Sequence, residues 1–245
     1  MKSHREQIQV DSSPMNLYIS QPEGSGPFPA VVLIQHQNGV DKFLEAMTER
    51  VAAAGYFGVT PDLYHRDDAD CKDDGPTRRA RLRDRPIVQD VNATLDYLKG
   101  QKVVNAGKVG IVGFCLGGRV AYLMAAASPS FSAAVSYYGG SIFRSWGDGP
   151  SPFERSAEIH CPIQGHFGEE DKNPSLEDMR KLDQELTRLG KAHEFYSYPG
   201  ADHGFMDPHH GSRYHAQADQ TSWPRTLDFF RKHLTDAIGK RAVAS

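Results

Sequence analysis

Residues 113–118 read Gly113-Phe114-Cys115-Leu116-Gly117-Gly118 and lie between two segments of different character. The preceding residues, 108–113, form a short apolar run that predicts a buried strand, and residues 116–127 are small and apolar and predict a helix. A tight strand-to-helix turn lifts its central residue out of the sheet and requires small residues two positions away on either side. The sequence has glycine at both positions, so the turn is predicted to present the Cys115 sulfur.

The helix expected after this turn would activate the thiol. Unpaired N–H groups at a helix N-terminus carry a partial positive charge, which favours the thiolate. The backbone N–H of Leu116 is also a candidate donor to an oxyanion that forms during acyl transfer. Cys115 is therefore a candidate nucleophile, and the alternative is a buried structural thiol on a glycine-rich turn.

The rest of the chain alternates short apolar runs with longer amphipathic segments, a pattern typical of βαβ units and a mainly parallel sheet. Strands are expected at residues 30–34, 57–60, 108–113, 133–138, 162–167 and 194–198, and helices at 41–54, 77–99, 116–127, 175–190 and 222–238. An antiparallel edge hairpin is expected within about residues 1–25, and residues 239–245 are expected to fray. The prediction is a single α/β domain over residues 1–245, with the central sheet flanked by helices.

Composition excludes several functional classes. The 245 residues include 28 Lys+Arg and 31 Asp+Glu, a net charge of −3, which gives no basic field for nucleic acid or an anionic membrane. The longest apolar runs are far shorter than the roughly 20 residues of a membrane span. The first residues lack the apolar segment of a signal peptide, and three cysteines cannot close a disulfide framework. We expect a cytoplasmic protein with a small-molecule substrate and neither nucleic acid nor membrane as partner.

Two later segments complete a nucleophile–acid–base set. In the α/β-hydrolase fold the acid follows a later strand and the histidine precedes the last helix, in the chain order nucleophile, acid, histidine. Asp171 follows the strand expected at 162–167, and His203 follows the last strand. We expect His203 to take the thiol proton and later to activate water, while Asp171 orients the imidazole. Glu169 and Glu170 are rivals for the acid role.

With these residues in place, the chain resembles the dienelactone hydrolase (carboxymethylenebutenolidase) family of the α/β-hydrolase fold, from about residue 30 to residue 230. The resemblance is carried by Gln35 with Gly39-Val40, Pro61-Asp62-Leu63-Tyr64, Lys108-Val109-Gly110, the turn at 113–118, Tyr137-Tyr138-Gly139, Asp171, His203 with Phe205, and Arg225-Thr226-Leu227-Asp228-Phe229. It implies a monomeric, cofactor-free enzyme whose thiolate attacks a lactone or ester carbonyl, forms an acyl-enzyme and releases it to water.

The resemblance also suggests contacts around the substrate. It implies the backbone N–H of Gln37 as the second oxyanion donor and Arg81 as a contact for a substrate carboxylate. Tyr137, Tyr138 and Phe205, with Trp146, are candidates for an aromatic pocket wall, and residues 139–158 are expected to line the mouth.

Two departures from the family pattern concern the substrate and the resting thiol. Family members with dienelactone activity carry Glu after the glutamine, where this chain has His36, and Arg near the substrate carboxylate, where this chain has Asp207. As an imidazolium, His36 would support the Cys115 thiolate; alternatively it only lines the pocket. Asp207 would repel a carboxylate, so we expect an altered substrate that is neutral, hydroxylated or cationic.

Other interpretations stay open at this point. The histidines near His203, together with Asp207, could be taken for a metal cluster, but their spacing matches no zinc signature and no metal is expected. Cys71 and Cys161 have no base partner and are expected to be bystanders. The same triad could instead cleave a carbon–carbon bond of a diketone-like substrate, or the fold could serve as a non-catalytic ligand-binding module.

Overall fold

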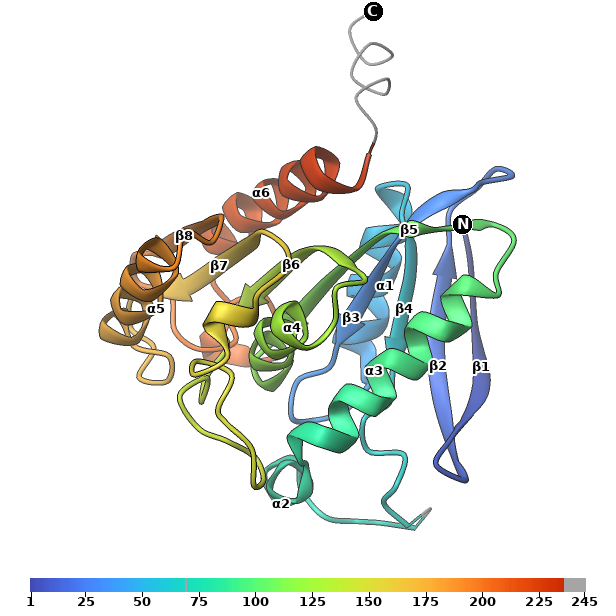
Figure 1. Cartoon of the computed structure of the whole chain (residues 1–245), viewed down its shortest axis with the longest axis horizontal. Helices are drawn as coiled ribbons and strands as arrows, with labels where there is room; N and C mark the ends of the chain where they lie inside the picture. Colours follow the sequence, from blue (N-terminus) through green and yellow to red (C-terminus); the bar gives the residue numbers. More distant parts are fainter. Residues whose placement is uncertain (69, 236–245) are drawn as a thin grey trace, which may run out of the picture.

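In the computed structural model, which describes residues 1–68 and 70–235, the chain forms an eight-stranded sheet in the order β1-β2-β4-β3-β5-β6-β7-β8 (Figure 1). The strands from β4 to β8 are parallel, while β1 and β2 form an antiparallel hairpin at one edge, as predicted. Their bounds are β1 Lys2–Val10, β2 Ser13–Gln21, β3 Phe28–Ile34, β4 Phe57–Pro61, β5 Val104–Phe114, β6 Phe131–Tyr137, β7 Ile163–Gly168 and β8 His193–Tyr198.

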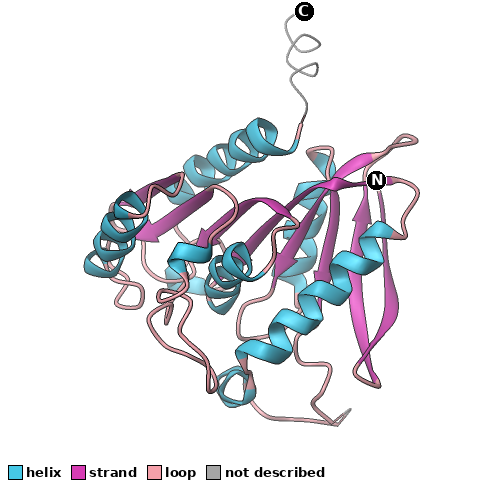
Figure 2. Ribbon diagram, viewed as in Figure 1, coloured by secondary structure: helices cyan, strands magenta, loops and turns pink. Residues whose placement is uncertain are grey.

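Helices cover both faces of this sheet (Figures 1 and 2). On one face lie α3 (Asp84–Lys99), α4 (Leu116–Ala127) and α5 (Leu176–Arg188), and on the other lie α1 (Lys42–Ala53) and α6 (Ala216–Leu234). Successive residues of β3 alternate between the two cores, so that Val32 packs in the α3–α5 core and Val31 in the α1–α6 core. The short helix α2 (Gly75–Arg81) lies at the lower rim in Figure 1, and single 3₁₀ turns occur at Ser156–Glu158 and Gly211–Arg213. The predicted mainly parallel sheet flanked by helices is therefore confirmed.

The single helix predicted for residues 77–99 is wrong, because the structure has two helices there. Leu82 has an extended backbone with ψ 142° after α2, and α3 starts at Asp84. In a continuous helix the ring of Pro86 would collide with the carbonyl of Leu82. Breaking the helix after Arg81 removes that collision and leaves Pro86 in the first turn of α3, where no helical partner for its missing N–H is needed.

The last helix begins six residues before the predicted start. The side chain of His215 accepts a hydrogen bond from the Ala218 N–H at 3.2 Å and caps α6, which then continues through Pro224. A proline inside a helix removes one backbone hydrogen bond, and α6 continues on both sides of it. The fray predicted for residues 239–245 lies outside the described residues.

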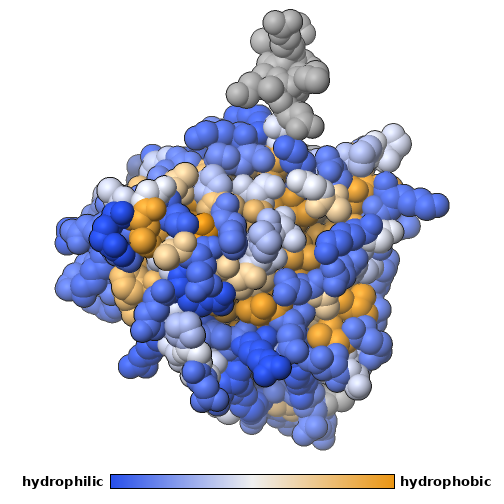
Figure 3. Space-filling view, in the orientation of Figure 1, coloured by the Kyte–Doolittle hydropathy of each residue, from blue (hydrophilic) through white to orange (hydrophobic). Residues whose placement is uncertain are grey.

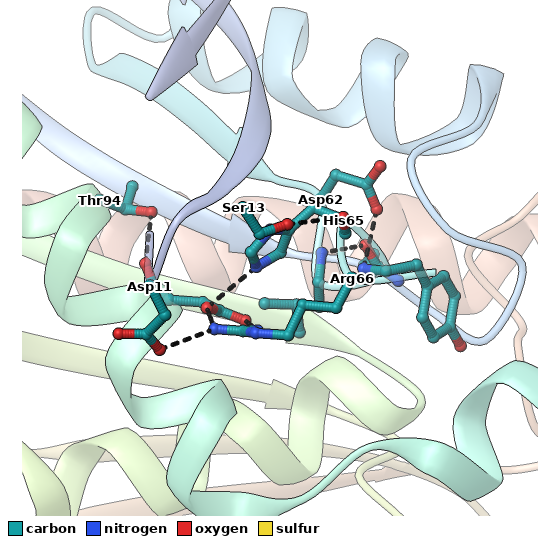
Figure 4. A network of polar contacts seen from close by, with 10 residues as sticks. Asp11, Ser13, Asp62, His65, Arg66 and Thr94 are labelled. Carbon is teal, nitrogen blue, oxygen red and sulfur yellow. Dashed lines mark hydrogen bonds and ion pairs between the residues drawn. The ribbon is translucent and has the colours of Figure 1, made fainter. Parts of the chain in front are cut away.

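A buried ion-pair cluster fastens the N-terminal hairpin to the sheet and to α3 (Figure 4). Asp90 is 1% exposed; its two oxygens accept from Arg66 at 2.8 and 2.7 Å, and one of them lies 3.1 Å from His65 Nε2. On the hairpin turn, Asp11 accepts from Arg66 at 3.3 Å, and Ser13 Oγ lies 3.2 Å from His65 Nδ1. The cluster therefore crosslinks three segments that are distant in sequence.

Few large apolar side chains of the described residues are exposed. Figure 3 shows a mostly hydrophilic face with small hydrophobic areas between. Among the described residues, Met1 and Phe143 are the large apolar side chains with substantial exposure. Over the same residues, no helix has the length and apolarity to cross a bilayer.

Candidate active site

The predicted nucleophile lies beside the predicted second oxyanion donor because of strand register. β3 and β5 are parallel neighbours, with Ile34 opposite Gly113. Cys115 comes two residues after Gly113, just beyond the end of β5. Gln37 comes three residues after Ile34, beyond the end of β3. Since the carboxyl ends of parallel strands share one sheet edge, the two backbones meet there.

The turn at Cys115 has the geometry that the glycine pattern predicted. Cys115 has φ 60° and ψ −118°, a region that L-residues rarely adopt, and it directly precedes α4. A Cβ on Gly113 would lie 1.9 Å from the Gly117 carbonyl oxygen, and one on Gly117 would lie 2.3 Å from that of Ile34. Both positions are therefore restricted to glycine.

His203 joins the other two members of the predicted triad. Its Nδ1 lies 2.8 Å from Asp171 Oδ2, and its imidazole forms a hydrogen bond with the Cys115 sulfur. Asp171 is only 4% exposed, and its second oxygen accepts from the Asn173 N–H at 2.8 Å, so the carboxylate is fixed. Of its rivals, Glu169 accepts instead from Ser197 Oγ at 2.8 Å, and Glu170 is exposed.

Electrostatics at this site favour a charged sulfur and a charged imidazole. Burial opposes the charged form of Cys115, but His203 and the backbone N–H groups of Leu116 and Gln37 together hold the pKa of this thiol below its ordinary value. Burial likewise opposes the imidazolium, yet Asp171 and Cys115 raise the pKa of His203 to about 10. Both shifts favour a thiolate paired with an imidazolium.

One peptide unit presents the N–H of Gln37 to the sulfur. That N–H belongs to the same planar unit as the carbonyl of His36, and the two groups point in opposite directions. The His36 carbonyl accepts from the Gly39 N–H at 3.1 Å, which fixes the plane, and the next carbonyl, that of Gln37, accepts from Tyr64 Oη at 2.9 Å. Gly39 closes this turn at φ 89°, a conformation that favours glycine.

The side chain of His36 has a role different from the one expected. It is 6% exposed, and its Nε2 lies 2.8 Å from Asp41 Oδ2. Asp41 in turn caps α1 by accepting from the N–H groups of Phe43 and Leu44. The hypothesis that His36 supports the Cys115 thiolate is therefore replaced by a structural pairing, because its imidazole is bound to Asp41 while other groups hold the sulfur.

A cavity of about 370 Å³ opens over the sulfur. Three cationic side chains line it, and none of them forms an ion pair among the described residues: Arg79 from α2, Lys172 beside the acid, and Arg213 from the turn before α6. Trp146 supplies an aromatic wall from the loop at residues 139–158, as expected for that loop. The remaining lining residues are Gln37, Cys115, Leu116, Gly140, Ser141, Asp171, Asn173, Asp202 and His203.

Four other predicted substrate contacts lie away from this cavity. Tyr137 and Phe205 are fully buried core residues, and Tyr137 Oη bonds to Thr226 at 2.7 Å. Asp207 is 5% exposed and accepts from the His209 N–H at 2.8 Å, so it closes a turn. Arg81 is on the outer side of α2, paired with Asp67 and Asp73 at 3.0 and 2.6 Å. These four side chains thus pack against or bond to other parts of the protein, and none of them lines the cavity.

The three cationic residues of the cavity could not be identified from the sequence, because few sequence features distinguish them from solvent-exposed residues. Lys172 follows the acid directly, which is a usable signal, and Arg79 belongs to an arginine run that is typical of a solvated helix face. Arg213 comes from a turn with no recognisable motif. Asp207 does not line the cavity, so the repulsion of a substrate carboxylate expected from its side chain has no basis in this structure.

A buried arginine holds the aromatic wall in place. Arg119, one turn after Cys115 on α4, is 0% exposed and lies with its guanidinium carbon 3.9 Å from the ring centre of Trp146. It donates to both oxygens of Asp84, at 2.5 and 3.1 Å, and Asp84 also accepts from the Trp146 N–H at 2.9 Å. These bonds therefore connect α3 and α4 to the loop at residues 139–158, which we call the mouth loop, beside the sulfur.

The histidines that follow His203 have separate partners. His215 caps α6, and the ring of His210 packs over Gly204. Over residues 1–68 and 70–235, no three or more His, Cys, Asp and Glu side chains are arranged to hold a metal ion.

Comparison with known proteins agrees with this architecture. The sequence model of the dienelactone hydrolase family matches residues 15–234. A candidate carboxymethylenebutenolidase of Synechocystis is 32% identical over 227 residues, which cover 89% of this chain and 91% of that protein. A candidate 2-oxo-3-(5-oxofuran-2-ylidene)propanoate lactonase of Bradyrhizobium is 30% identical over 231 residues, which cover 92% of this chain and 91% of that protein.

A solved structure extends the agreement to three dimensions. The crystal structure of a candidate dienelactone hydrolase from Klebsiella pneumoniae superposes with a TM-score of 0.86 at 26% identity, covering 95% of this chain and all of the other. The chain therefore belongs to the dienelactone hydrolase family, within the α/β-hydrolase superfamily, and is a hydrolase of lactone or ester bonds.

Proposed function

We propose that the protein is a cysteine hydrolase that opens a small anionic lactone or ester through a thioester acyl-enzyme. The observation that carries this proposal is the position of His203, which bonds to the Cys115 sulfur on one side and lies 2.8 Å from Asp171 on the other. A nucleophile, a base and a group that orients the base form the minimal set for acyl transfer.

In the first half-reaction the Cys115 thiolate attacks the carbonyl carbon. The carbonyl oxygen becomes an oxyanion, which takes over the N–H groups of Leu116 and Gln37 that hold the resting sulfur. As the tetrahedral species collapses, the carbon–oxygen bond to the leaving group breaks, and the His203 imidazolium gives its proton to that oxygen. A thioester on Cys115 and a neutral imidazole remain.

In the second half-reaction water completes the cycle. The neutral His203 takes a proton from water, and the hydroxide formed attacks the thioester carbonyl. Collapse of the second tetrahedral species breaks the carbon–sulfur bond, releases the acid and restores the thiolate–imidazolium pair. Asp171 keeps its charge throughout and stabilises the imidazolium.

Cations around the cavity support an anionic substrate. Arg79, Lys172 and Arg213 line the space over the sulfur, whereas its two lining carboxylates, Asp171 and Asp202, accept from the ring and the backbone N–H of His203. Free positive charge in a cleft concentrates anions and raises their association rate. A carboxylate-bearing ester is therefore expected to be used better than its neutral counterpart.

Steady-state hydrolysis of 4-methylphenyl acetate and of 4-acetoxybenzoate tests the proposal. We expect turnover of both esters, a higher kcat/KM for the benzoate, and loss of at least a thousandfold in Cys115→Ala and His203→Ala. Rapid acid quench and mass spectrometry should find one acetyl group on wild-type protein and none on Cys115→Ala. Retained turnover in Cys115→Ala, or turnover by a wild-type protein that never carries an acetyl group on Cys115, would overturn the proposal.

A further inference from the structure

Beside the cavity over Cys115 lies a second one of about 320 Å³. The two share Arg79, Ser141 and Trp146 as lining residues, so they meet at these side chains. The second cavity extends between α2 and the loop at residues 139–158, two segments that lie at the same lower edge in Figure 1. The first residue of α3, Asp84, holds this loop nearby, because its N–H donates to the Trp146 carbonyl at 2.8 Å.

Charge in the second cavity has one sign. Arg79, Arg83 and Arg144 line it, together with the hydroxyls of Ser141 and Ser145, and no carboxylate is among its lining residues. None of the three arginines forms an ion pair with a described residue, although the chain as a whole carries a net charge of −3.

The neighbouring arginines show that this is not a general property of α2. Arg78 and Arg81 both pair with Asp67. Arg83 instead donates one guanidinium nitrogen to the carbonyls of Ala80 and Leu82, both at 2.8 Å, which orients the group and leaves its charge uncompensated. Of the three arginines of α2, Arg79 is thus the one without a carboxylate partner among the described residues, and it is the one that lines the two cavities.

We propose that the second cavity binds a phosphate-like dianion carried by the substrate at the end remote from the scissile carbonyl. The inference deepens the proposed hydrolase function and rests on it. Guanidinium groups match the oxygen geometry of phosphate and keep their charge at every physiological pH, and three of them suit a dianion better than a carboxylate.

Trp146 provides the connecting surface between the two groups. It lines both cavities, so that the carbon skeleton between ester and phosphate would lie against its ring. The ring is held from behind by buried Arg119 at 3.9 Å. The surface is therefore formed before the substrate arrives, which lowers the entropic cost of binding.

A matched set of aryl acetates tests the inference. We would compare 4-acetoxybenzylphosphonate, 4-acetoxyphenylacetate and 4-methylphenyl acetate, which carry a dianion, a monoanion and no charge on similar leaving groups. In wild type, kcat/KM is expected to be at least tenfold higher for the phosphonate than for the carboxylate, chiefly through a lower KM. In the double variant Arg83→Gln/Arg144→Gln this ratio should fall by at least tenfold.

The control is Arg155→Gln, an arginine of the same loop that lies outside both cavities and pairs with Glu158 at 2.7 Å. It is expected to keep the wild-type ratio. Equal kcat/KM for phosphonate and carboxylate in wild type would overturn the inference, as would a ratio unaffected by the double variant. Inorganic phosphate that changes kcat for the neutral ester, without any phosphonate preference, would point to an effector site instead. Turnover of the neutral ester by Cys115 tests the proposed function separately.

Discussion

His36 and Asp41 form a partly buried pair, with 2.8 Å between Nε2 and Oδ2, that closes the segment from which the proposed second oxyanion donor comes. The same Asp41 caps α1, so the end of β3, the turn at Gly39 and the start of α1 are held as one unit. The N–H of Gln37 lies within this unit. His36 is thus a positioning residue, which acts on the sulfur through a backbone group.

This relationship predicts the behaviour of the thiol in His36→Ala. Because His203 contributes more than the Gln37 N–H to holding down the Cys115 pKa, removing the His36 imidazole should raise that pKa only slightly while lowering kcat about tenfold. His203→Gln should raise the same pKa clearly more, since it removes the principal partner that stabilises the thiolate. The rate of iodoacetamide alkylation as a function of pH measures both. An equal rise in the two variants would show that His36 acts on the sulfur directly.

The pH profile of turnover is predicted to depend on the leaving group. Below the lowered pKa of Cys115 the sulfur is protonated and kcat/KM falls with decreasing pH. Above the His203 pKa of about 10 the imidazole is neutral and cannot protonate an alkoxide. Simple alkyl esters should therefore give a bell-shaped profile, whereas 4-nitrophenyl acetate, whose leaving group needs no proton, should keep its rate on the alkaline side. Identical alkaline limbs for both esters would argue against His203 as the acid.

Gly39→Ala tests the orientation of the Gln37 N–H. Gly39 has φ 89°, and its N–H fixes the peptide plane that carries this donor. Alanine should shift the turn and lower kcat about tenfold to hundredfold with little change in KM, because the donor acts on the transition state. Gly55→Ala is the matched control, since Gly55 has φ 93° and follows α1 at a site where an added methyl group would meet no atom within 4 Å. Both variants should lose about 1 kcal/mol of stability, and only the first should lose kcat.

The nucleophile turn could be predicted from sequence because its requirements are local. Gly113 and Gly117 are fixed by contacts with the adjacent backbone, and any sequence with such a turn must have small residues there. The relation of Asp171 and His203 follows nearly as directly, because β7 and β8 are neighbours and both residues come after the ends of these strands. The order of the three residues along the chain and the parallel pairing of the strands that precede them are therefore enough to predict most of the triad geometry.

The cavity lining could not be predicted in the same way, because it depends on where long loops pack. Arg213 and Arg79 reach one cavity from segments more than a hundred residues apart, and no periodic pattern links them. The sequence suggests an interaction of His36 with the Cys115 thiolate, whereas in the structure its imidazole pairs with Asp41, five residues further along the chain. Side-chain pairing within a loop is decided by backbone direction, which the residue types alone do not reveal.

Stability away from the site is predicted to depend on Asp90. This carboxylate is 1% exposed and bonds to both Arg66 and His65, so Asp90→Asn leaves the Arg66 guanidinium without its counter-charge. Such a loss costs about 3–5 kcal/mol in a fully buried pair, and because the Arg66 side chain is 33% exposed we expect a value near 3 kcal/mol or lower. Urea unfolding measures it, with Asp96→Asn as control, since Asp96 is 72% exposed, pairs with Lys99 and should change stability by less than about 0.5 kcal/mol. kcat should stay at the wild-type value in both variants, because neither carboxylate lines the cavity over Cys115. A stability loss below about 1 kcal/mol for Asp90→Asn would mean that the cluster is not the fastening that its burial indicates.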